Sequence, residues 1–399
     1  MSSKESNKYG EKPNKHSRKN KKLFQTKSFK IVLILILTVL FLTLGLNIRN
    51  LSPANVVNWV QGTLLGMNKG DGFPADIIGS KVNTGNFNVF DNDISYVSDT
   101  SFVALNKSAA EDINRQHSFS NPIYKSTNNY ALIYNLGGKQ FQLEKKSKTE
   151  IKSTLGNNII AGAVSQTGKC AFITESNDYF SEMVVLSVKN GEVKEEYKYY
   201  FSEYYITNVA INSDGRSGVA SGVYSDEGVI KSAVYIFDFT SEKPKGIIEY
   251  PDNMIIDLKY SVSERPVAVF DKSVSIIDTS RQTHNDYSYE NKSIVSYEID
   301  DGEVVLALSE TSVGGNGQVV ALNLSAKEKA KFDTKTRIIS VSASSGKIVV
   351  LSDSEVNEYT YNGDIKNTLK VSGDSKKIRL MSGGRLYVLG VCKINLLHL

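Results

Sequence analysis

One short segment of the sequence concentrates side chains that could bind a ligand. Residues 195–205 contain five tyrosines, one phenylalanine and three glutamates. On a β-strand, Tyr197 and Tyr199 would share one face and Tyr200 would lie on the other. Exposed aromatic rings beside carboxylates can hold a sugar ring or a protein partner. The alternative is an outer strand whose tyrosines pack between sheets and keep their hydroxyls in solvent. The candidate binding surface comprises Tyr197, Tyr199, Tyr200, Tyr204 and Tyr205.

Histidines and cysteines, the usual metal ligands and nucleophiles, are few and scattered. The four histidines are His16, His117, His284 and His398. None is at a spacing typical of metal ligands, so we expect each of them at a surface or turn position. Cys170 and Cys392 are expected to be buried thiols in strands of different repeats. A disulfide would require those two strands to be neighbours, so none is predicted.

No known catalytic motif is present. Asp91/Asp93 and Asp300/Asp301 could bind calcium or serve a hydrolase, but no further ligands follow at an EF-hand spacing. The glycine-rich residues 314–317 lie between two expected strands without a following helix, which indicates a hairpin turn rather than a phosphate loop. The sequence also lacks a nucleophile elbow and a zinc-protease motif. We therefore expect no catalytic residue, no cofactor, no metal and no enzymatic activity.

The charge is divided unevenly along the chain. Residues 1–30 carry ten lysines or arginines and two glutamates, whereas the whole chain has a formal net charge of +4. The remainder is therefore mildly acidic, which argues against nucleic acid as a partner, because such binding needs clustered cations. Residues 1–30 also have almost no apolar side chains, and we expect them to be a disordered cytoplasmic tail.

An uncharged apolar stretch follows the basic tail. Residues 31–48 would span about 27 Å as a helix, close to the thickness of the hydrocarbon core of a bilayer. We interpret them as an uncleaved signal anchor in the cell membrane. The basic residues before the span predict a cytoplasmic N-terminus and a body outside the membrane. One alternative is a signal peptide cleaved near residues 52–54. A buried core helix fits less well because the stretch is not amphipathic.

The segment after the anchor is expected to connect it to the main domain. Ser52 and Pro53 suit the N-cap and first turn of a helix that continues to about Leu65. The Gly-Asp-Gly-Phe-Pro sequence at residues 70–74 would end the stalk. This division predicts a stalk helix and linker over 49–74 and an extracytoplasmic domain over 75–399.

The main domain repeats a local pattern. Short apolar runs are bounded by tight-turn residues, and no long amphipathic helix is evident, which indicates an all-β fold. An apolar strand, a turn ending in glycine and a second strand recur at residues 163–171, 210–219, 299–304, 341–348 and 380–386. The spacing from Gly168 to Gly384 gives a mean period of about 43 residues. This period, with four strands per unit, is typical of a β-propeller.

Two stretches carry a resemblance to known propellers. Residues 212–216, Asn-Ser-Asp-Gly-Arg, are similar to the repeat of TolB-like and WD40-like propellers, and residues 102–114 look like a quinoprotein-type blade. The whole layout resembles a family of uncharacterised, membrane-anchored β-propeller proteins of Gram-positive bacteria. The chain's one tryptophan, Trp59, lies outside the repeats. The tryptophan that docks quinoprotein blades is therefore missing, and a quinone cofactor is not expected.

These observations predict seven or eight four-stranded blades after one transmembrane helix, with eight as the first choice. A strand at residues 76–82 would complete the last blade, 375–399, and close the ring without free sheet edges. We expect a non-catalytic binding or scaffolding module at the cell envelope. Its expected partners are the lipid bilayer, through the anchor, and envelope proteins or cell-wall glycan. The alternative is an envelope enzyme acting on glycans or a quinone-dependent dehydrogenase, which would need acids or histidines around the central channel.

Overall fold

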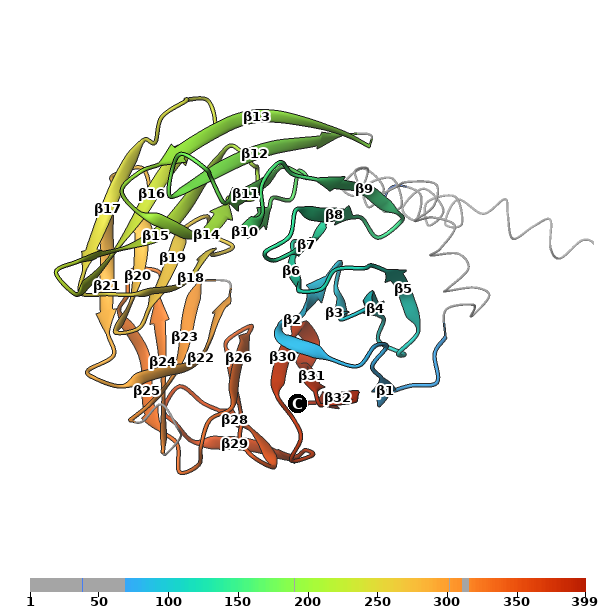
Figure 1. Ribbon diagram of the computed structural model, residues 1–399. Helices are drawn as coiled ribbons and strands as arrows, with labels where there is room; N and C mark the ends of the chain where they lie inside the picture. The colour runs from blue at the N-terminus through green and yellow to red at the C-terminus, as the bar shows by residue number, and fades with distance from the viewer. Residues whose placement is uncertain (1–37, 39–68, 190, 301, 311–315) are drawn as a thin grey trace, which may run out of the picture. The chain divides into compact units, whose positions relative to one another are not determined.

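The computed structural model describes residues 38, 69–189, 191–300, 302–310 and 316–399. Within these residues, the strands form eight four-stranded antiparallel sheets arranged around a ring (Figure 1). The expected tail and anchor, and the stalk up to residue 68, lie outside the described residues apart from residue 38. In the described part of the chain, no helix is long and apolar enough to cross a membrane.

The first four blades follow one another along the chain, each running from the inner strand to the outer strand. Blade 1 contains β2 (Val82–Phe90), β3 (Asp93–Ser98), β4 (Ser101–Leu105) and β5 (Glu111–Gln116). Blade 2 contains β6 (Pro122–Ser126), β7 (Ala131–Asn135), β8 (Gln140–Glu144) and β9 (Thr149–Thr154). Blade 3 contains β10 (Ile159–Val164), β11 (Cys170–Thr174), β12 (Ser181–Lys189) and β13 (Glu192–Phe201). Blade 4 contains β14 (Tyr205–Ile211), β15 (Ser217–Asp226), β16 (Val229–Asp238) and β17 (Gly246–Pro251).

The other four blades complete the ring, and the last one takes its outer strand from the start of the domain. Blade 5 contains β18 (Ile255–Tyr260), β19 (Pro266–Phe270), β20 (Ser273–Asp278) and β21 (Thr283–Ser288). Blade 6 contains β22 (Ser293–Asp300), β23 (Glu303–Ser309), β24 (Gly317–Asn323) and β25 (Glu328–Asp333). Blade 7 contains β26 (Ser340–Ser344), β27 (Lys347–Leu351), β28 (Glu355–Tyr359) and β29 (Ile365–Lys370). Blade 8 contains β30 (Lys377–Met381), β31 (Arg385–Leu389), β32 (Lys393–His398) and β1 (Ala75–Asp76).

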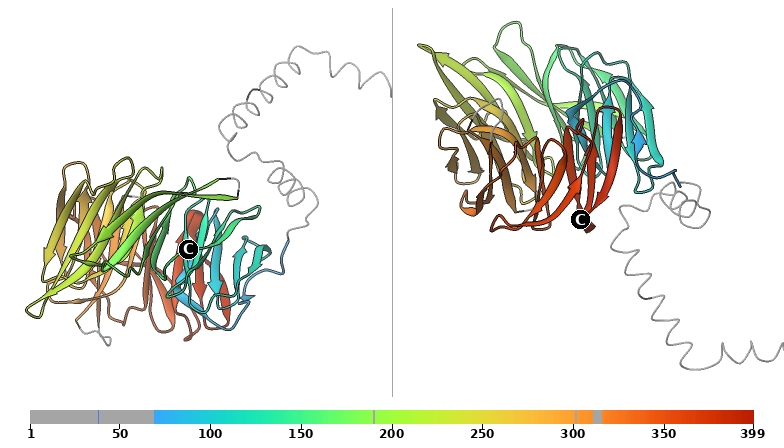
Figure 2. Two further views of the ribbon diagram at one scale, coloured as in Figure 1. Left: turned by 45° about the horizontal axis from the view of Figure 1, so that its top comes forward. Right: turned by 90° about the horizontal axis from the view of Figure 1, so that it is seen from below.

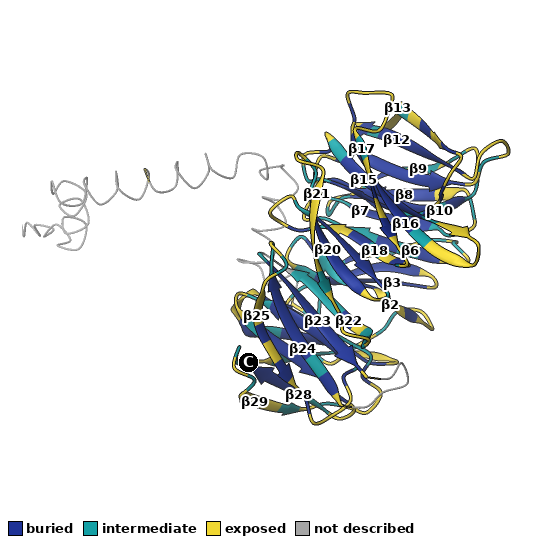
Figure 3. Ribbon diagram, turned by 90° about the vertical axis from the view of Figure 1, so that its left-hand side faces the viewer, coloured by how far each residue is buried: buried dark blue, intermediate teal, exposed yellow. Residues whose placement is uncertain are grey.

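The burial of each strand explains its sequence. The second strands, such as β11 (Cys-Ala-Phe-Ile-Thr) and β19 (Pro-Val-Ala-Val-Phe), are buried on both faces and are therefore apolar throughout. The outer strand β25 alternates exposed lysines with Ala330 and Phe332, because only one of its faces meets a neighbour. Figure 3 shows this gradient, with dark blue central strands and yellow loops. The strands that the sequence revealed most clearly are thus those between two sheets.

Packing between adjacent blades holds the ring together. The described residues form eight hydrophobic clusters, and each cluster combines side chains from two neighbouring blades. The cluster between blades 8 and 1 joins Tyr387 and Ile394 to Phe87 and Tyr96. Figure 2 shows the sheets standing side by side around the body. Because every blade depends on two neighbours, closure of the ring matters for the stability of the whole body.

The repeated turn has the same backbone geometry with and without glycine. Gly168 and Gly215 have positive φ angles of 85° and 73°, and each N–H donates to a carbonyl three residues earlier. In blade 5 the same place is taken by Glu264, with φ of 60° and a bond from its N–H to the Ser261 carbonyl. A residue without the freedom of glycine can therefore occupy this turn, at the cost of a strained conformation.

The ring closes by strand exchange with the start of the domain, as predicted, but the closing strand is shorter and begins one residue earlier than expected. In β1, Ala75 pairs with Ile394 and Asp76 with Lys393, and the Ile77 N–H donates to the Cys392 carbonyl at 2.9 Å. The expected strand over 76–82 is wrong in its bounds, since Val82 already begins β2 of blade 1. A turn separates the two strands. It contains Gly79 at φ 100° and is held by Asp99, which accepts hydrogen bonds from the N–H (2.8 Å) and hydroxyl (2.6 Å) of Ser80.

The two cysteines differ in their surroundings. Cys170 is buried in β11 and Cys392 is exposed in the turn between β31 and β32, and both are free thiols. The expectation of two buried cysteines is therefore wrong for Cys392, because the chain reverses there instead of continuing as a strand. Burial raises the pKa of the Cys170 thiol above its usual range.

Candidate functional site

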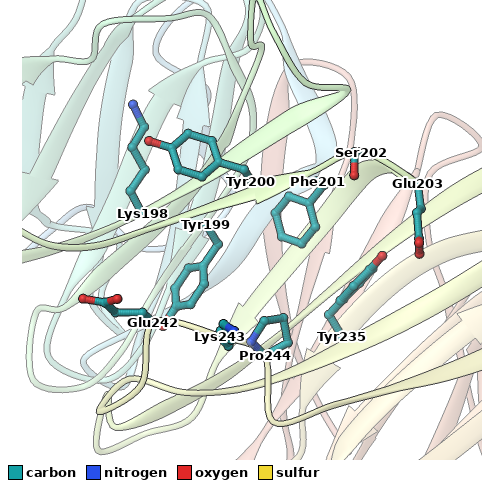
Figure 4. Close-up of a pocket in the computed structure, with 10 residues that line it drawn as sticks. All are labelled: Lys198, Tyr199, Tyr200, Phe201, Ser202, Glu203, Tyr235, Glu242, Lys243 and Pro244. Carbon is teal, nitrogen blue, oxygen red and sulfur yellow. The ribbon is translucent and has the colours of Figure 1, made fainter.

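The tyrosine-rich segment forms β13 and the start of β14, and it borders a groove of about 340 Å³ (Figure 4). We call this cavity the tyrosine groove. One wall comes from β13 of blade 3, and the other comes from β16 and the β16–β17 connection of blade 4. Its lining comprises Lys198, Tyr199, Tyr200, Phe201, Ser202, Glu203, Tyr235, Glu242, Lys243 and Pro244. Ligand pockets are commonly of this size or larger.

The predicted alternation along β13 is present. The rings of Tyr197 and Tyr199 lie on one face, stacked at 6.2 Å between centroids. Tyr200 lies on the opposite face, where its ring is 4.8 Å from that of Tyr179. Tyr200 is 52% exposed, whereas Tyr199 is only 3% exposed. The alternation of faces therefore buries Tyr199 in the core and leaves Tyr200 open to solvent.

Two of the five candidate tyrosines belong to the core between blades 3 and 4. Tyr199 and Tyr204 are buried in the same hydrophobic cluster, with Tyr197 half-buried against it. The Tyr199 hydroxyl donates to the Ser241 carbonyl at 2.7 Å, and the Tyr204 hydroxyl donates to Glu249 Oε1 at 2.8 Å. Burial, and then the nearby Glu249 carboxylate, raise the pKa of Tyr204. These tyrosines follow the packing alternative, except that their hydroxyls are bonded to protein instead of water.

Tyr200 and Tyr205 are the candidates with substantial exposure, and the structure adds aromatic neighbours that the sequence segment did not contain. Tyr179 and Phe180, in the β11–β12 connection, are 43% and 52% exposed. The Phe180 N–H donates to the Phe201 carbonyl at 2.9 Å, which fixes this connection beside β13. The adjacent Tyr179 and Phe180 in an otherwise polar connection could have been recognised in the sequence as part of a binding surface. Its position beside Tyr200 depends on the hairpin register, in which Glu182 pairs with Tyr200.

Charged groups lie beside the aromatic rings of the tyrosine groove. The Lys198 ammonium is 5.7 Å from the centre of the Tyr200 ring and pairs with Glu182 at 3.0 Å. The hydrogen bond to Glu182 raises the pKa of Lys198, so this cation stays protonated. Glu203 and Glu242 contribute carboxylates to the lining. The groove thus combines flat apolar rings and hydrogen-bond acceptors with one cation, Lys198, that is held by an ion pair.

The other candidate residues occupy separate structural positions. His117 Nε2 lies 3.1 Å from the Ser98 carbonyl oxygen, and His284 Nδ1 lies 2.8 Å from Asp286 Oδ1. Lys146 pairs with both Asp91 and Asp93 at 3.0 and 2.9 Å. No group of three or more acidic, histidine or cysteine side chains that could hold a metal ion occurs among the described residues. Asp301 and residues 314–315 lie outside the described residues, and Gly317 begins β24.

The fold and the groove define the class of this protein as an eight-bladed β-propeller with an interblade cavity. The chain belongs to DUF5711, a family of unknown function whose profile matches residues 76–399. This result supports the predicted resemblance to an uncharacterised β-propeller family. No curated protein matches the sequence.

Solved structures share the fold at low sequence identity. The C-terminal WD40 domain of Sif2 is 13% identical, with a TM-score of 0.58 over 83% of this chain and 98% of that one. Sqt1 of Saccharomyces cerevisiae is 8% identical, with a TM-score of 0.52 over 82% and 100% of the two chains. BamB of Moraxella catarrhalis is 12% identical, with a TM-score of 0.49 over 82% and 100%. The similarity to the WD40 domain of Sif2 concerns the fold alone, and it agrees with the predicted WD40-like repeats.

Proposed function

We propose that this protein is a non-catalytic, membrane-anchored binding module that recognises cell-wall glycan through the tyrosine groove. The observation that carries the proposal is the groove between blades 3 and 4, where the rings of Phe201 and Tyr235 lie with the carboxylates of Glu203 and Glu242 (Figure 4). The exposed Tyr200 ring lies beside Tyr179 on the other face of β13, at the edge of this groove. A propeller supplies a rigid frame for such a site, because the groove walls belong to two sheets that pack on each other.

The chemistry of a sugar suits this arrangement. A sugar ring has an apolar face of C–H groups and a rim of hydroxyls. Aromatic rings pack against apolar faces, and carboxylates accept hydrogen bonds from hydroxyls. The rings of Phe201 and Tyr235 and the carboxylates of Glu203 and Glu242 line one cavity, and together they match both features. A protein partner would more commonly require a larger apolar area than this groove presents.

The sequence supports the proposed location. The uncharged residues 31–48 and the ten basic residues before Ile31 support an anchor with the propeller on the outer side of the cell membrane. A binding module in that place would link the lipid bilayer, through its anchor, to the wall outside it. No role in nucleic-acid binding is proposed, because the net positive charge is confined to residues 1–30 and the rest of the chain is mildly acidic.

Sedimentation of the purified full chain with insoluble peptidoglycan tests the proposal. We expect Tyr200→Ala to weaken binding by about tenfold, because an aromatic contact contributes about 0.5–1.5 kcal/mol beyond its buried area. Ile365→Ala is the matched control, since Ile365 is 56% exposed on β29 of blade 7. If Tyr200→Ala binds peptidoglycan as the wild type does, the tyrosine groove is not the glycan site. Competition by peptides but not by wall oligosaccharides would assign the groove to a protein partner.

A further inference from the structure

A second cavity is lined by residues of the inner strands of several blades. These strands surround the centre of the ring (Figure 1), and we call the space between them the central channel. The volume of this cavity is about 520 Å³, and the basic residues in its lining are Lys125 on β6, Lys259 on β18 and Arg379 on β30. Lys377 lies two residues before Arg379 on β30 and therefore on the same face of that strand. A smaller cavity of about 150 Å³ shares Lys125 and adds Asp257.

The carboxylates in the channel are already paired. Glu298 forms an ion pair with Arg379, whose guanidinium also donates to Asn88 Oδ1 at 2.6 Å. Asp257 lies 3.1 Å from the Lys259 ammonium and accepts a hydrogen bond from the Tyr297 hydroxyl.

Two lysines in the channel lack such a partner. Among the residues that the structure describes, no carboxylate lies within ion-pair distance of Lys125 or Lys377. At the mouth, Glu264 also lines the cavity, and its carboxylate accepts a hydrogen bond from the Ser213 N–H. These two cations therefore have no ion-pair partner among the described residues, and the nearby carboxylates are paired with other groups.

The ionisation behaviour of the channel agrees with an excess of positive charge. Burial lowers the pKa of Lys377 to about 8, and repulsion from Arg379 and Lys259 adds to this effect while Glu298 opposes it. Burial alone would raise the pKa of Asp257, but the attraction of Lys259 and Lys125 holds it below its usual range. Cations without an ion-pair partner in a confined, poorly solvated channel lower the stability of the folded protein. Their presence therefore indicates a role in binding a ligand.

The mouth of the same cavity is polar and uncharged over much of its rim. The turns that follow β6 and β10 contribute Thr127, Asn128, Ser165 and Gln166 to the lining. The side chains of Asn128 and Gln166 are exposed there. Amides and hydroxyls of this kind both donate and accept hydrogen bonds, which suits the hydroxyl groups of a small ligand.

We propose that the central channel binds a small phosphate monoester of a sugar or polyol, with its phosphate among Lys125, Lys377 and Arg379 and its hydroxyls at the mouth. The two unpaired lysines match the charge of a phosphate monoester, which is about −2 at neutral pH. The guanidinium of Arg379 offers fixed donors of the kind that recognise phosphate oxygens. This site is separate from the tyrosine groove and does not depend on the proposed glycan binding.

Isothermal titration of the purified full chain in detergent with glucose 1-phosphate tests this proposal. We expect the double variant Lys125→Gln/Lys377→Gln to bind at least about tenfold more weakly, as the loss of charge-assisted hydrogen bonds predicts. The control is Lys370→Gln, an exposed lysine on the outer strand β29. All variants retain basic residues 1–30, so phosphate binding to that segment would be the same in each.

Three further measurements decide the outcome. Glucose should bind more weakly than glucose 1-phosphate because it is uncharged. Glucuronate should also bind more weakly, because it carries one negative charge instead of about two. Circular dichroism melting without ligand should show that the double variant is folded. Equal binding of glucose 1-phosphate by the double variant and by Lys370→Gln would overturn the proposal, as would equal binding of glucuronate and glucose 1-phosphate by the wild type.

Discussion

Replacing Lys377 with methionine should stabilise the folded propeller at neutral pH. The Lys377 side chain lies in the central channel, where burial lowers its pKa to about 8 and the nearby Arg379 and Lys259 disfavour its charge further. Methionine has a similar length and no charge, so it can occupy the same space without the electrostatic cost. In the variant, Glu298 keeps its ion pair with Arg379, so the substitution leaves no carboxylate unpaired.

The size of the effect follows from the pKa of Lys377. Lysine in an unfolded chain has a pKa of about 10.5, and each difference of one in pKa corresponds to about 1.4 kcal/mol. A native pKa of about 8 means that holding the protonated side chain in the channel costs about 3 kcal/mol. Below pH 8 both states are protonated and this cost is complete. As the pH rises towards about 10.5, the folded state loses the proton first, so the wild type becomes more stable.

Urea unfolding of residues 68–399, which form a compact unit of their own, measures this difference. The free energy of unfolding of Lys377→Met should exceed that of the wild type by about 3 kcal/mol at neutral pH. The gap should shrink as the pH approaches about 10.5, because the wild type alone gains stability from the deprotonation of Lys377. A variant that is less stable at neutral pH, or a gap that does not change with pH, would refute the reasoning.

Three other predictions concern closure, thiol reactivity and topology. Deleting residues 70–77 from the propeller removes β1 and should lower the melting temperature or cause aggregation, because β32 then has a free edge; deleting residues 50–69 from the full chain should not. If both deletions melt alike, closure does not depend on β1. In the native protein a maleimide should label Cys392 and not Cys170, whereas labelling of both before unfolding would contradict the observed burial. Protease added to wall-stripped cells should degrade the propeller and spare the basic tail, and protection of the propeller would disprove the proposed topology.

Features with a local physical cause could be predicted from the sequence. Second strands such as β11 and β19 are buried on both faces, so their apolar runs are visible without knowledge of their neighbours. Turns such as the one at Gly215 have a positive φ angle, which favours glycine and so marks most copies of the repeat. The alternation of Tyr199 and Tyr200 follows from the geometry of any strand. An all-β propeller of seven or eight blades was predictable on these grounds, and the structure has eight.

Features that depend on distant segments could not be predicted in detail. The two-residue strand β1 carries no local pattern, and its bounds are set by pairing with β32 at the other end of the chain. Tyr200 meets Tyr179 only because the β12–β13 register places their segments together.

The basic channel is the clearest case of a feature that only the tertiary structure decided. Lys125 and Lys259 are single basic residues on the inner strands of blades 2 and 5, and Lys377 and Arg379 lie on the inner strand of blade 8; nothing in the sequence joins them. The repeat itself was encoded locally, by burial and turn geometry. The meeting of these charges was decided by ring closure, which turns the inner face of every blade towards one common axis.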